Sequence, residues 1–255
     1  MMIVYKTLEE IALMREAGRI VAQVFAYLQK GIQPGVMLSE IDRLAEDYLR
    51  KYGAEPLYKG YRQFPDQPPF PGVITTSVNQ EVCHGIPDRR MLRQGDIIGI
   101  DIGLRYRGWC GDACVTYGVG RISKKAQRLL QVARECLEVG IRAAQPGNHL
   151  GDIGAAIQSC AERNGYQVVR EYGGHGIGRE LHESPFVPHF GPAGKGLLLK
   201  PGLVLAIEPM INAGTSECVM KDDGWTAVTA DGSLSAQFEH TVAITQQGPV
   251  ILSLP

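Results

Sequence analysis

The sequence predicts an α/β fold in which a duplicated set of helices and strands forms two related halves. Residues 34–53 and 146–165 both begin with Pro-Gly-x-x-Leu-x-acid-Ile and both end at a glycine. This arrangement is typical of an amphipathic helix that starts after a turn and ends at a C-cap glycine. Another helical pattern precedes each of them, at residues 8–30 and 124–144. Two helix pairs at corresponding positions favour an internal duplication with pseudo-two-fold symmetry.

A second set of matches follows the helices in each half. The tripeptide His-Gly-Ile occurs at His84 and again at His175. An apolar run comes later in each half, at residues 92–101 and 199–208, and each run ends at a carboxylate six residues after a glycine. Such runs are typical of buried strands. Because helix, helix, histidine and acid-ended strand recur in the same order, chance matches are a poor explanation.

The length and composition favour a single domain. The 255 residues contain no linker rich in Ser, Gly and Pro, so we expect one domain over residues 1–255, with halves of about 1–120 and 121–255. The Pro-rich stretch 66–72 is interpreted as a surface loop.

Charge and cysteine content exclude several classes of function. The chain has 26 basic and 27 acidic residues and a net charge of −1, which predicts no basic surface for nucleic acid or an anionic membrane. No apolar run approaches the length of a membrane span, and the first residues do not resemble a signal peptide. The six cysteines form no CxxC pair, so we interpret them as buried free thiols of a cytoplasmic protein.

Two aspartates in a predicted hairpin suggest a cation site. Asp101 lies in an otherwise apolar strand, where a carboxylate is costly unless it is paired or binds a cation. If the tip of the hairpin lies near Tyr106 and Arg107, Asp101 pairs directly with Asp112 on one face of the sheet. Directly opposed residues have Cβ atoms roughly 4.5–5.5 Å apart. Two carboxylates so close repel each other, which predicts metal ions between them.

The second half supplies matching ligands. Glu208 ends one apolar run, and Glu239 lies in a strand-like run, SAQFEHTVAIT. Almost no Lys or Arg lies within these strands, so four unrelated salt bridges are a poor alternative. Adding His175, whose neighbouring glycines allow a close backbone approach, gives a set of oxygen ligands with one imidazole. Such a set suits Mn, Fe, Co or Zn better than Ca or Mg.

The other histidines divide into two groups. His84 and His182 are left free beside the predicted metal site, where they could stabilise an oxyanion or hold a leaving group. His149 and His189 are interpreted as ordinary core or surface residues. Strand alternation points His240 to the opposite face from its neighbour Glu239.

Five stretches of the chain resemble the successive signatures of type I methionine aminopeptidases. They read NQEVCHGIP, GIDIGLRYRGWCGDA, GGHGIGRELHESP, AIEPM and GWTAVTADGSLSAQFEHT. The resemblance implies a pita-bread fold, in which a pseudo-two-fold duplicated antiparallel sheet is covered by helices, and makes residues 1–255 a single catalytic domain. The implied activity is hydrolysis of the initiator methionine from nascent proteins whose second residue is small.

The resemblance also implies how two divalent metal ions (Co, Mn, Fe or Zn) are held. Asp101 chelates one ion, and His175 and Glu208 bind the other. Asp112 and Glu239 bridge both ions, together with a water or hydroxide. That bridging species is the implied nucleophile, with its pKa lowered by the metals.

Catalytic and substrate-binding roles follow from the same resemblance. His84 contacts the substrate near the scissile peptide nitrogen, and His182 steadies the carbonyl oxygen as it becomes tetrahedral. Glu208 is also a candidate proton shuttle. Trp225 matches the family's pocket tryptophan, and Thr75 lies where the methionine pocket forms.

The stretch before Thr75 departs from the family pattern. Residues 58–77 are longer than the usual short link and lack the cysteine often found near position 75. Tyr58, Tyr61 and Phe70 lie where the rest of the pocket should form, and the sequence leaves open which of them line it.

Two other classes of protein could carry the same set of residues. An X-Pro aminopeptidase or prolidase shares the five ligands, but these enzymes usually carry a large N-terminal domain, and only about thirty residues precede the first repeat here. A non-catalytic binding protein on the same fold typically loses metal ligands. The expected partners are N-termini of nascent polypeptides, with a transient ribosome contact, no nucleic acid and no membrane, and the family suggests a monomer.

Overall fold

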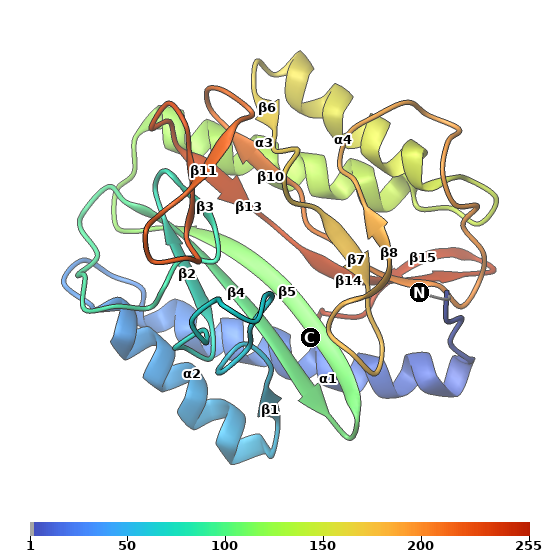
Figure 1. Ribbon diagram of the computed structural model, residues 1–255, viewed down its shortest axis with the longest axis horizontal. Coiled ribbons are helices and arrows are strands. Elements are labelled where there is room, and N and C mark those ends of the chain that lie inside the picture. The colour runs from blue at the N-terminus through green and yellow to red at the C-terminus, as the bar shows by residue number, and fades with distance from the viewer. Residues whose placement is uncertain (1–2) are drawn as a thin grey trace.

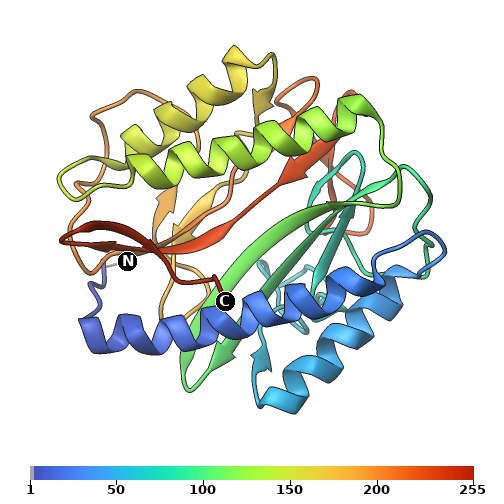
Figure 2. The ribbon, with the colours of Figure 1, turned by 180° about the vertical axis from the view of Figure 1, so that it is seen from behind.

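The computed structural model describes residues 3–255 and has helices on two sides of the strands. Figures 1 and 2 show α1 (Leu8–Leu28) and α2 (Leu38–Tyr52) on one side, and α3 (Lys124–Ala143) and α4 (Leu150–Arg163) on the other. A 3-10 turn, η1 (Gln29–Gly31), follows α1. The strands are β1 (Glu55–Pro56), β2 (Thr75–Val78), β3 (Glu81–Cys83), β4 (Ile97–Tyr106), β5 (Trp109–Gly118), β6 (Gln167–Val168), β7 (Gly174–Gly176), β8 (Glu183–Val187), β9 (Val204–Ile207), β10 (Met210–Asn212), β11 (Cys218–Met220), β12 (Ala227–Thr229), β13 (Ser235–Gln237), β14 (His240–Thr245) and β15 (Gly248–Ile251).

The strands of the described residues form four antiparallel sheets. One has the order β1-β4-β2, with β5 also paired to β4, and another has the order β15-β14-β9-β7-β8. Two smaller sheets have the orders β13-β10-β6 and β11-β12-β3. The predicted combination of helices with antiparallel sheets is therefore confirmed.

The helices begin and end where local chemistry favours it. At the start of α1, the Thr7 hydroxyl accepts a hydrogen bond from the amide of Glu10, and the Glu10 carboxylate accepts one from the amide of Thr7. This reciprocal capping box satisfies two amides that the helix leaves unpaired. At the C-terminal end of α2, Gly53 adopts the left-handed conformation at φ 65°, which glycine reaches without steric cost. The four predicted helices are thus confirmed, with α1 ending slightly early at its 3-10 turn.

Two glycines allow α1 to lie directly on the backbone of β5 and of the segment after β15. A Cβ atom at Gly18 would overlap the carbonyl oxygen of Leu252, and one at Gly111 would press on the backbone of Ala17. The close approach helps bury Val21, whose side chain is fully inaccessible. Removing such apolar surface from water is the main stabilising contribution to a core of this kind.

The register of the β4–β5 hairpin differs from the prediction. Asp101 lies opposite Cys114, and Asp112 lies opposite Gly103. The prediction that the aspartates oppose each other directly is wrong, because the tip falls at Arg107 and Gly108, whose φ angles are 51° and 77°. Two positive φ angles are what the favoured two-residue hairpin turn requires. Moving the tip by one residue changes each pairing by two, so both aspartates still share one face as diagonal neighbours.

The run that contains Glu239 is interrupted. It divides into β13 and β14, which belong to different sheets, and Glu239 lies between them. The amide of Glu239 donates to the carbonyl of Cys114 on β5 at 2.9 Å. The break therefore turns the Glu239 carboxylate towards the other acidic residues rather than along a continuous strand.

Two expectations about the whole chain can be compared with the structure. All six cysteine thiols are free, and all but Cys218 are buried, as predicted. Among residues 3–255, no helix combines the length and the apolar character needed to cross a membrane.

Candidate active site

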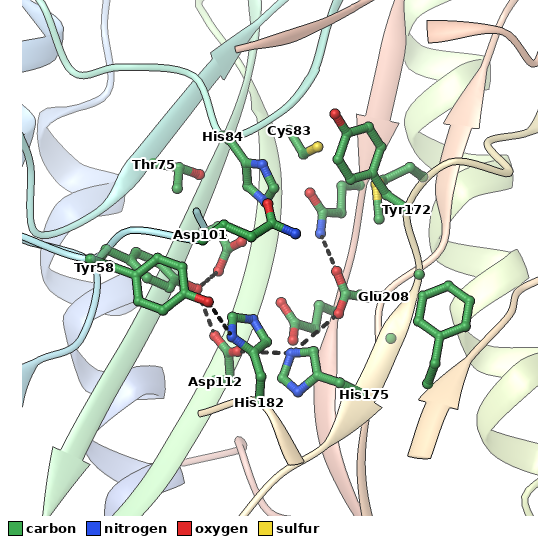
Figure 3. Close-up of a pocket in the computed structure, with 18 of the residues that line it drawn as sticks. Tyr58, Thr75, Cys83, His84, Asp101, Asp112, Tyr172, His175, His182 and Glu208 are labelled. Carbon is green, nitrogen blue, oxygen red and sulfur yellow. Dashed lines mark hydrogen bonds and ion pairs between the residues drawn. The ribbon is translucent and has the colours of Figure 1, made fainter. Parts of the chain in front are cut away.

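A cavity of about 430 Å³ collects the residues that the sequence singled out. Figure 3 shows Asp101 and Asp112 facing His175 and Glu208 across it, with His84 and His182 at its sides. Its walls hold every predicted metal, catalytic and pocket residue: Thr75, His84, Asp101, Asp112, His175, His182, Glu208, Trp225 and Glu239. The cavity wall formed by residues 3–255 contains no Lys or Arg.

Asp101 and Asp112 are linked by a tyrosine hydroxyl. The Tyr58 oxygen lies 2.6 Å from Oδ1 of Asp101 and 2.9 Å from Oδ1 of Asp112. The ring reaches this position because Gly103 lies between the aspartates on the sheet, where a Cβ atom would press on the ring at 2.9 Å. Burial and the two carboxylates raise the pKa of Tyr58, so its hydroxyl keeps its proton as a donor.

His175 brings an imidazole nitrogen to the carboxylates. Its Nε2 lies 3.5 Å from Oε1 of Glu208 and 3.7 Å from Oδ2 of Asp112. Its Nδ1 lies 2.9 Å from the carbonyl oxygen of Gly176, which fixes the proton on Nδ1 and leaves the Nε2 lone pair directed at the acids. A Cβ atom at Gly174 would overlap the carbonyl oxygen of Ala206, so glycine is needed for this packing.

The geometry identifies a group of residues suited to cations, which we call the carboxylate cluster. It consists of Asp101, Asp112, His175, Glu208 and Glu239. Single ligand atoms of Asp112, His175 and Glu239 all lie within 4.8 Å of one another. The buried Oε1 of Glu239 has no hydrogen-bond partner among the described residues.

The electrostatics of the carboxylate cluster also call for a cation. Burial raises the pKa of Asp101 to about 6. Burial, reinforced by the neighbouring carboxylates, raises the pKa of Asp112, Glu208 and Glu239 well above the usual range. Burial lowers the pKa of His175 to about 3, so this imidazole is neutral and can act as a ligand. Buried acids without basic partners are costly, and a bound divalent cation offsets that cost. The residues present fit a metal site.

His84 is held by its backbone as well as by its neighbours. It follows β3 directly and adopts φ 56°, a left-handed conformation that is uncommon for a residue with a Cβ. Its ring packs edge-on against Tyr172 at 5.5 Å and Trp225 at 6.4 Å. Burial lowers its pKa to about 4, which leaves the ring neutral at pH 7.

His182 lies against both the carboxylate cluster and the aromatic side of the cavity. Its ring centroid is 4.4 Å from that of His175, and its Nδ1 is 3.2 Å from the Tyr61 hydroxyl. The side chain is open to the cavity, and desolvation by the surrounding walls lowers its pKa. His182 is therefore a neutral imidazole beside the cluster.

Four rings form what we call the aromatic wall: Tyr58, Tyr61, Phe70 and Trp225. Phe70 packs edge-on against Trp225 at 5.2 Å and against Tyr58 at 6.4 Å, and Tyr61 lies 6.3 Å from Trp225. The Trp225 Nε1 donates to the carbonyl of Pro68 at 2.8 Å. Phe70 is only 3 % exposed, so the stretch 66–72, expected to be a surface loop, contributes a buried anchor to the cavity. All three aromatic residues that the sequence left open therefore line the cavity.

Comparison with known proteins identifies the family. The sequence matches the model of metallopeptidase family M24 over residues 12–246. The chain belongs to metallopeptidase family M24. Its pita-bread fold, predicted from the resemblance, is confirmed by the structures that it matches.

Several family members are close in sequence. Methionine aminopeptidase 1 of Bacillus subtilis is 50% identical over 252 residues, which cover 99% of both chains. Methionine aminopeptidase of Escherichia coli is 42% identical over 256 residues, covering 100% of this chain and 95% of its own. The crystal structure of methionine aminopeptidase from Rickettsia prowazekii has a TM-score of 0.96 and 42% identity, with coverage of 99% and 100%.

More distant M24 proteins share the fold alone. The prolidase from Pyrococcus furiosus has a TM-score of 0.78 and 22% identity, and the match covers 99% of this chain but 66% of the prolidase. Membership of a metallopeptidase family implies a divalent metal, for which Asp112, His175 and Glu239 form a candidate site.

Several residues that the sequence did not single out hydrogen-bond to Glu208 or line the cavity. The Gln237 amide donates to Oε2 of Glu208 at 3.2 Å. His189, interpreted as an ordinary residue, is 1% exposed, and its Nε2 accepts the amide hydrogen of Glu208 at 3.2 Å. Cys83 and Tyr172 also line the cavity. Cys83 directly precedes His84, and Gln237 lies two residues before Glu239, so both were adjacent to residues that the sequence singled out. His189 carried no such signal.

The other histidines match their interpretation. His149 occupies the N-cap of α4. His240 has its Nδ1 2.8 Å from the Ser253 hydroxyl and does not line the cavity.

Proposed function

We propose that this chain is a methionine aminopeptidase, which hydrolyses the initiator methionine from polypeptides whose second residue is small. The observation that carries the proposal is one cavity in which the carboxylate cluster lies beside the aromatic wall. The cluster fits peptide hydrolysis, and the wall fits an unbranched apolar side chain with a polarizable sulfur. Relatives named methionine aminopeptidase that match nearly the whole chain support the same activity.

In this proposal the carboxylate cluster holds two divalent ions. Asp101 would hold one ion, His175 and Glu208 would hold the other, and Asp112 and Glu239 would contribute to both. The diagonal placement of the aspartates on one face and the orphaned oxygen of Glu239 support this assignment. When bound, the ions would supply a Lewis acid that lowers the pKa of water and polarises the substrate carbonyl.

The remaining roles belong to the chain's own side chains. Glu208, whose carboxylate lines the cavity, takes the proton of the attacking water and passes it to the departing amine. His182 donates a hydrogen bond to the carbonyl oxygen as it gains negative charge. His84, held beside Trp225, contacts the substrate near the scissile nitrogen.

The aromatic wall binds the methionine side chain. Methionine sulfur makes favourable contacts at ring edges, and the rings of Phe70 and Trp225 stand at 83° to each other, which offers both an edge and a face. Thr75, directly opposite Asp101 in the β2–β4 pairing, closes the pocket next to the cluster. We further propose that residues 1–255 act as one catalytic domain with two related halves, and that the partners are N-termini of nascent chains.

The test is release of free methionine from three peptides. Protein treated with chelator, and then reconstituted with Mn or Co, is incubated with Met-Ala-Ser, Met-Leu-Ser and an Ala-Pro peptide. The proposal predicts metal-dependent cleavage of Met-Ala-Ser alone. Cleavage of the Ala-Pro peptide instead would assign the chain to the X-Pro peptidases that share its fold. No cleavage with any metal would contradict an enzymatic role.

A further inference from the structure

Tyr61 is a residue of the aromatic wall that also contacts the candidate catalytic residue His182. Its hydroxyl oxygen lies 3.2 Å from Nδ1 of His182, and the two ring centroids are 5.6 Å apart. Within residues 3–255, this contact is the only hydrogen bond of the His182 ring. Among the described residues, Tyr61 is therefore the group that can set the position of the His182 ring proton by a hydrogen bond.

The backbone holds Tyr61 firmly in place. Its amide donates to the carbonyl of Tyr58 at 2.9 Å, and its own carbonyl accepts the amide of Phe70 at 2.9 Å. The amide of Gly60 donates to the carbonyl of Phe70 at 2.8 Å. The two bonds to Phe70 close the segment 62–69 into a loop whose two ends are joined beside Tyr61, and the bond to Tyr58 forms the turn before it.

The same loop is tied to the turn that carries Trp225. The Gln67 side-chain amide donates to the carbonyl of Gly224 at 2.7 Å, and its oxygen accepts the amide of Gln63 at 2.9 Å. The Trp225 indole donates to the carbonyl of Pro68 at 2.8 Å. The loop therefore fixes the distance between Tyr61 and the tryptophan of the aromatic wall.

The contact at Nδ1 decides what Nε2 can do. A neutral imidazole has one donor nitrogen and one acceptor nitrogen. A phenol is a stronger donor than a neutral imidazole, because its O–H is the more acidic group. If the Tyr61 hydroxyl donates to Nδ1, the proton of His182 resides on Nε2. Only that tautomer can donate a hydrogen bond to a carbonyl oxygen.

We propose that Tyr61 is a positioning residue that holds His182 as the Nε2–H tautomer and fixes the orientation of its ring. Tyr61 thereby connects the methionine-binding wall to the histidine that steadies the substrate carbonyl. The catalytic part of this inference rests on the proposed peptidase function. The tautomer itself does not, because it is a property of the free protein.

The direct test is NMR of ¹⁵N-histidine-labelled protein without metal or substrate. Long-range ¹H–¹⁵N spectra distinguish a protonated ring nitrogen from an unprotonated one, and the signal that disappears in His182→Gln assigns the residue. Wild-type protein should show a protonated Nε2 and an unprotonated, hydrogen-bonded Nδ1 at His182. In Tyr61→Phe the two tautomers should mix, whereas Tyr27→Phe, a matched change at an exposed tyrosine on α1, should leave the spectrum unchanged.

Kinetics on Met-Ala-Ser provide the second readout. Tyr61→Phe keeps the ring of the aromatic wall, so KM should change little while kcat falls roughly 3- to 10-fold, the range expected for one hydrogen bond. A purely structural role would instead lower the melting temperature and change kcat and KM together. Circular dichroism of each variant verifies folding.

The outcomes separate the inference from the proposed function. A wild-type His182 protonated at Nδ1, or a Tyr61→Phe variant with unchanged tautomer and unchanged kcat, would overturn the inference. If wild-type protein shows the Nε2–H tautomer and Tyr61→Phe loses it, the positioning role stands, even if no peptide is cleaved. Such a lack of cleavage would count against the proposed peptidase alone.

Discussion

The carboxylate cluster and the aromatic wall share one cavity but are built in different ways. The cluster projects from strands or from residues next to strands, and Asp112 and Glu239 are only 3% and 2% exposed. The aromatic wall comes mainly from a loop and a turn, Tyr58–Phe70 and Lys221–Thr226, which are joined by side-chain hydrogen bonds. Strands hold ligands to a fixed spacing, whereas a loop can change its length without disturbing the sheet beneath it.

This difference separates two functions that a peptidase needs. Chemistry depends on atoms held in place before the substrate arrives, so it benefits from buried strands. Choice of side chain depends on the shape of a pocket, which loop residues can reshape. Changes in the cluster should therefore abolish turnover. Changes in the apolar rings of the wall, Phe70 and Trp225, should shift substrate binding while leaving the cluster intact.

The largest effect is expected from loss of a cluster ligand. His175→Ala should lower kcat/KM for Met-Ala-Ser by roughly 10³-fold, because the fixed imidazole lone pair is lost. Metal analysis after dialysis should show less bound metal per chain. His149→Asn is the control, since asparagine also caps a helix and His149 lies away from the cavity. Equal metal content in both variants would mean that His175 is not a ligand.

The second effect concerns the stability of metal-free protein. In the folded chain the pKa of Asp101 is raised from 3.8 to about 6, so the folded state retains a proton that the unfolded chain loses in this range. Stability therefore falls as the pH rises from about 4 to 6 and stays reduced above it. At pH 7, metal-free Asp101→Asn should be more stable than wild type by about 3 kcal/mol, with no difference near pH 4.

Urea unfolding of both metal-free proteins at pH 4 and pH 7 measures this difference. Adding metal should reverse the order at pH 7, because only the wild-type carboxylate binds the ion. A wild-type chain that matches Asp101→Asn at both pH values would show that this acid carries no cost without metal.

A smaller effect is expected at the aromatic wall. Phe70→Leu should raise KM for Met-Ala-Ser by about 5-fold, because part of the apolar surface that would bury methionine is lost, at about 1 kcal/mol. Bound metal and kcat should stay near wild type. Phe64→Leu is the matched control, since Phe64 lies in the same loop but is 61% exposed. A large loss of kcat or bound metal in Phe70→Leu would contradict the claim that the wall affects substrate binding and the cluster affects turnover.

The smallest effect is expected where the loop meets the turn. Gln67→Ala removes the bond to the Gly224 carbonyl and should raise KM for Met-Ala-Ser about 2-fold through a looser loop. Gln33→Ala, an exposed glutamine before α2, should leave KM unchanged. An unchanged KM in Gln67→Ala would show that the loop keeps its shape through Phe70 and Pro68 alone.

The sequence predicted the elements that carry the cluster because strong patterns mark them. Asp101 and Glu208 each end an apolar run, and a carboxylate in such a run is unusual enough to mark a functional residue. The hairpin register was wrong by two residues, since sequence alone did not show whether the positive-φ turn falls at Tyr106 and Arg107 or one residue later. Both aspartates kept their common face because strand alternation has a period of two.

Other parts of the site were beyond a single sequence. Gln237 and His189 support Glu208 through contacts between segments that are distant in sequence, and no local pattern records such a meeting. The stretch 66–72 looks like a surface loop because prolines surround its one buried aromatic residue, Phe70. Whether a loop folds back over a cavity depends on the bonds at its tip, such as those of Gln67 and Trp225, which periodicity does not reveal.

The most direct test is a crystal structure of the protein with Mn and free methionine, with the ions located by anomalous scattering. We expect ion peaks in contact with Asp112 and Glu239, and the methionine sulfur against Phe70 and Trp225. Ions bound elsewhere, or a methionine side chain placed away from the aromatic wall, would contradict the claim that one cavity joins the carboxylate cluster to a methionine pocket.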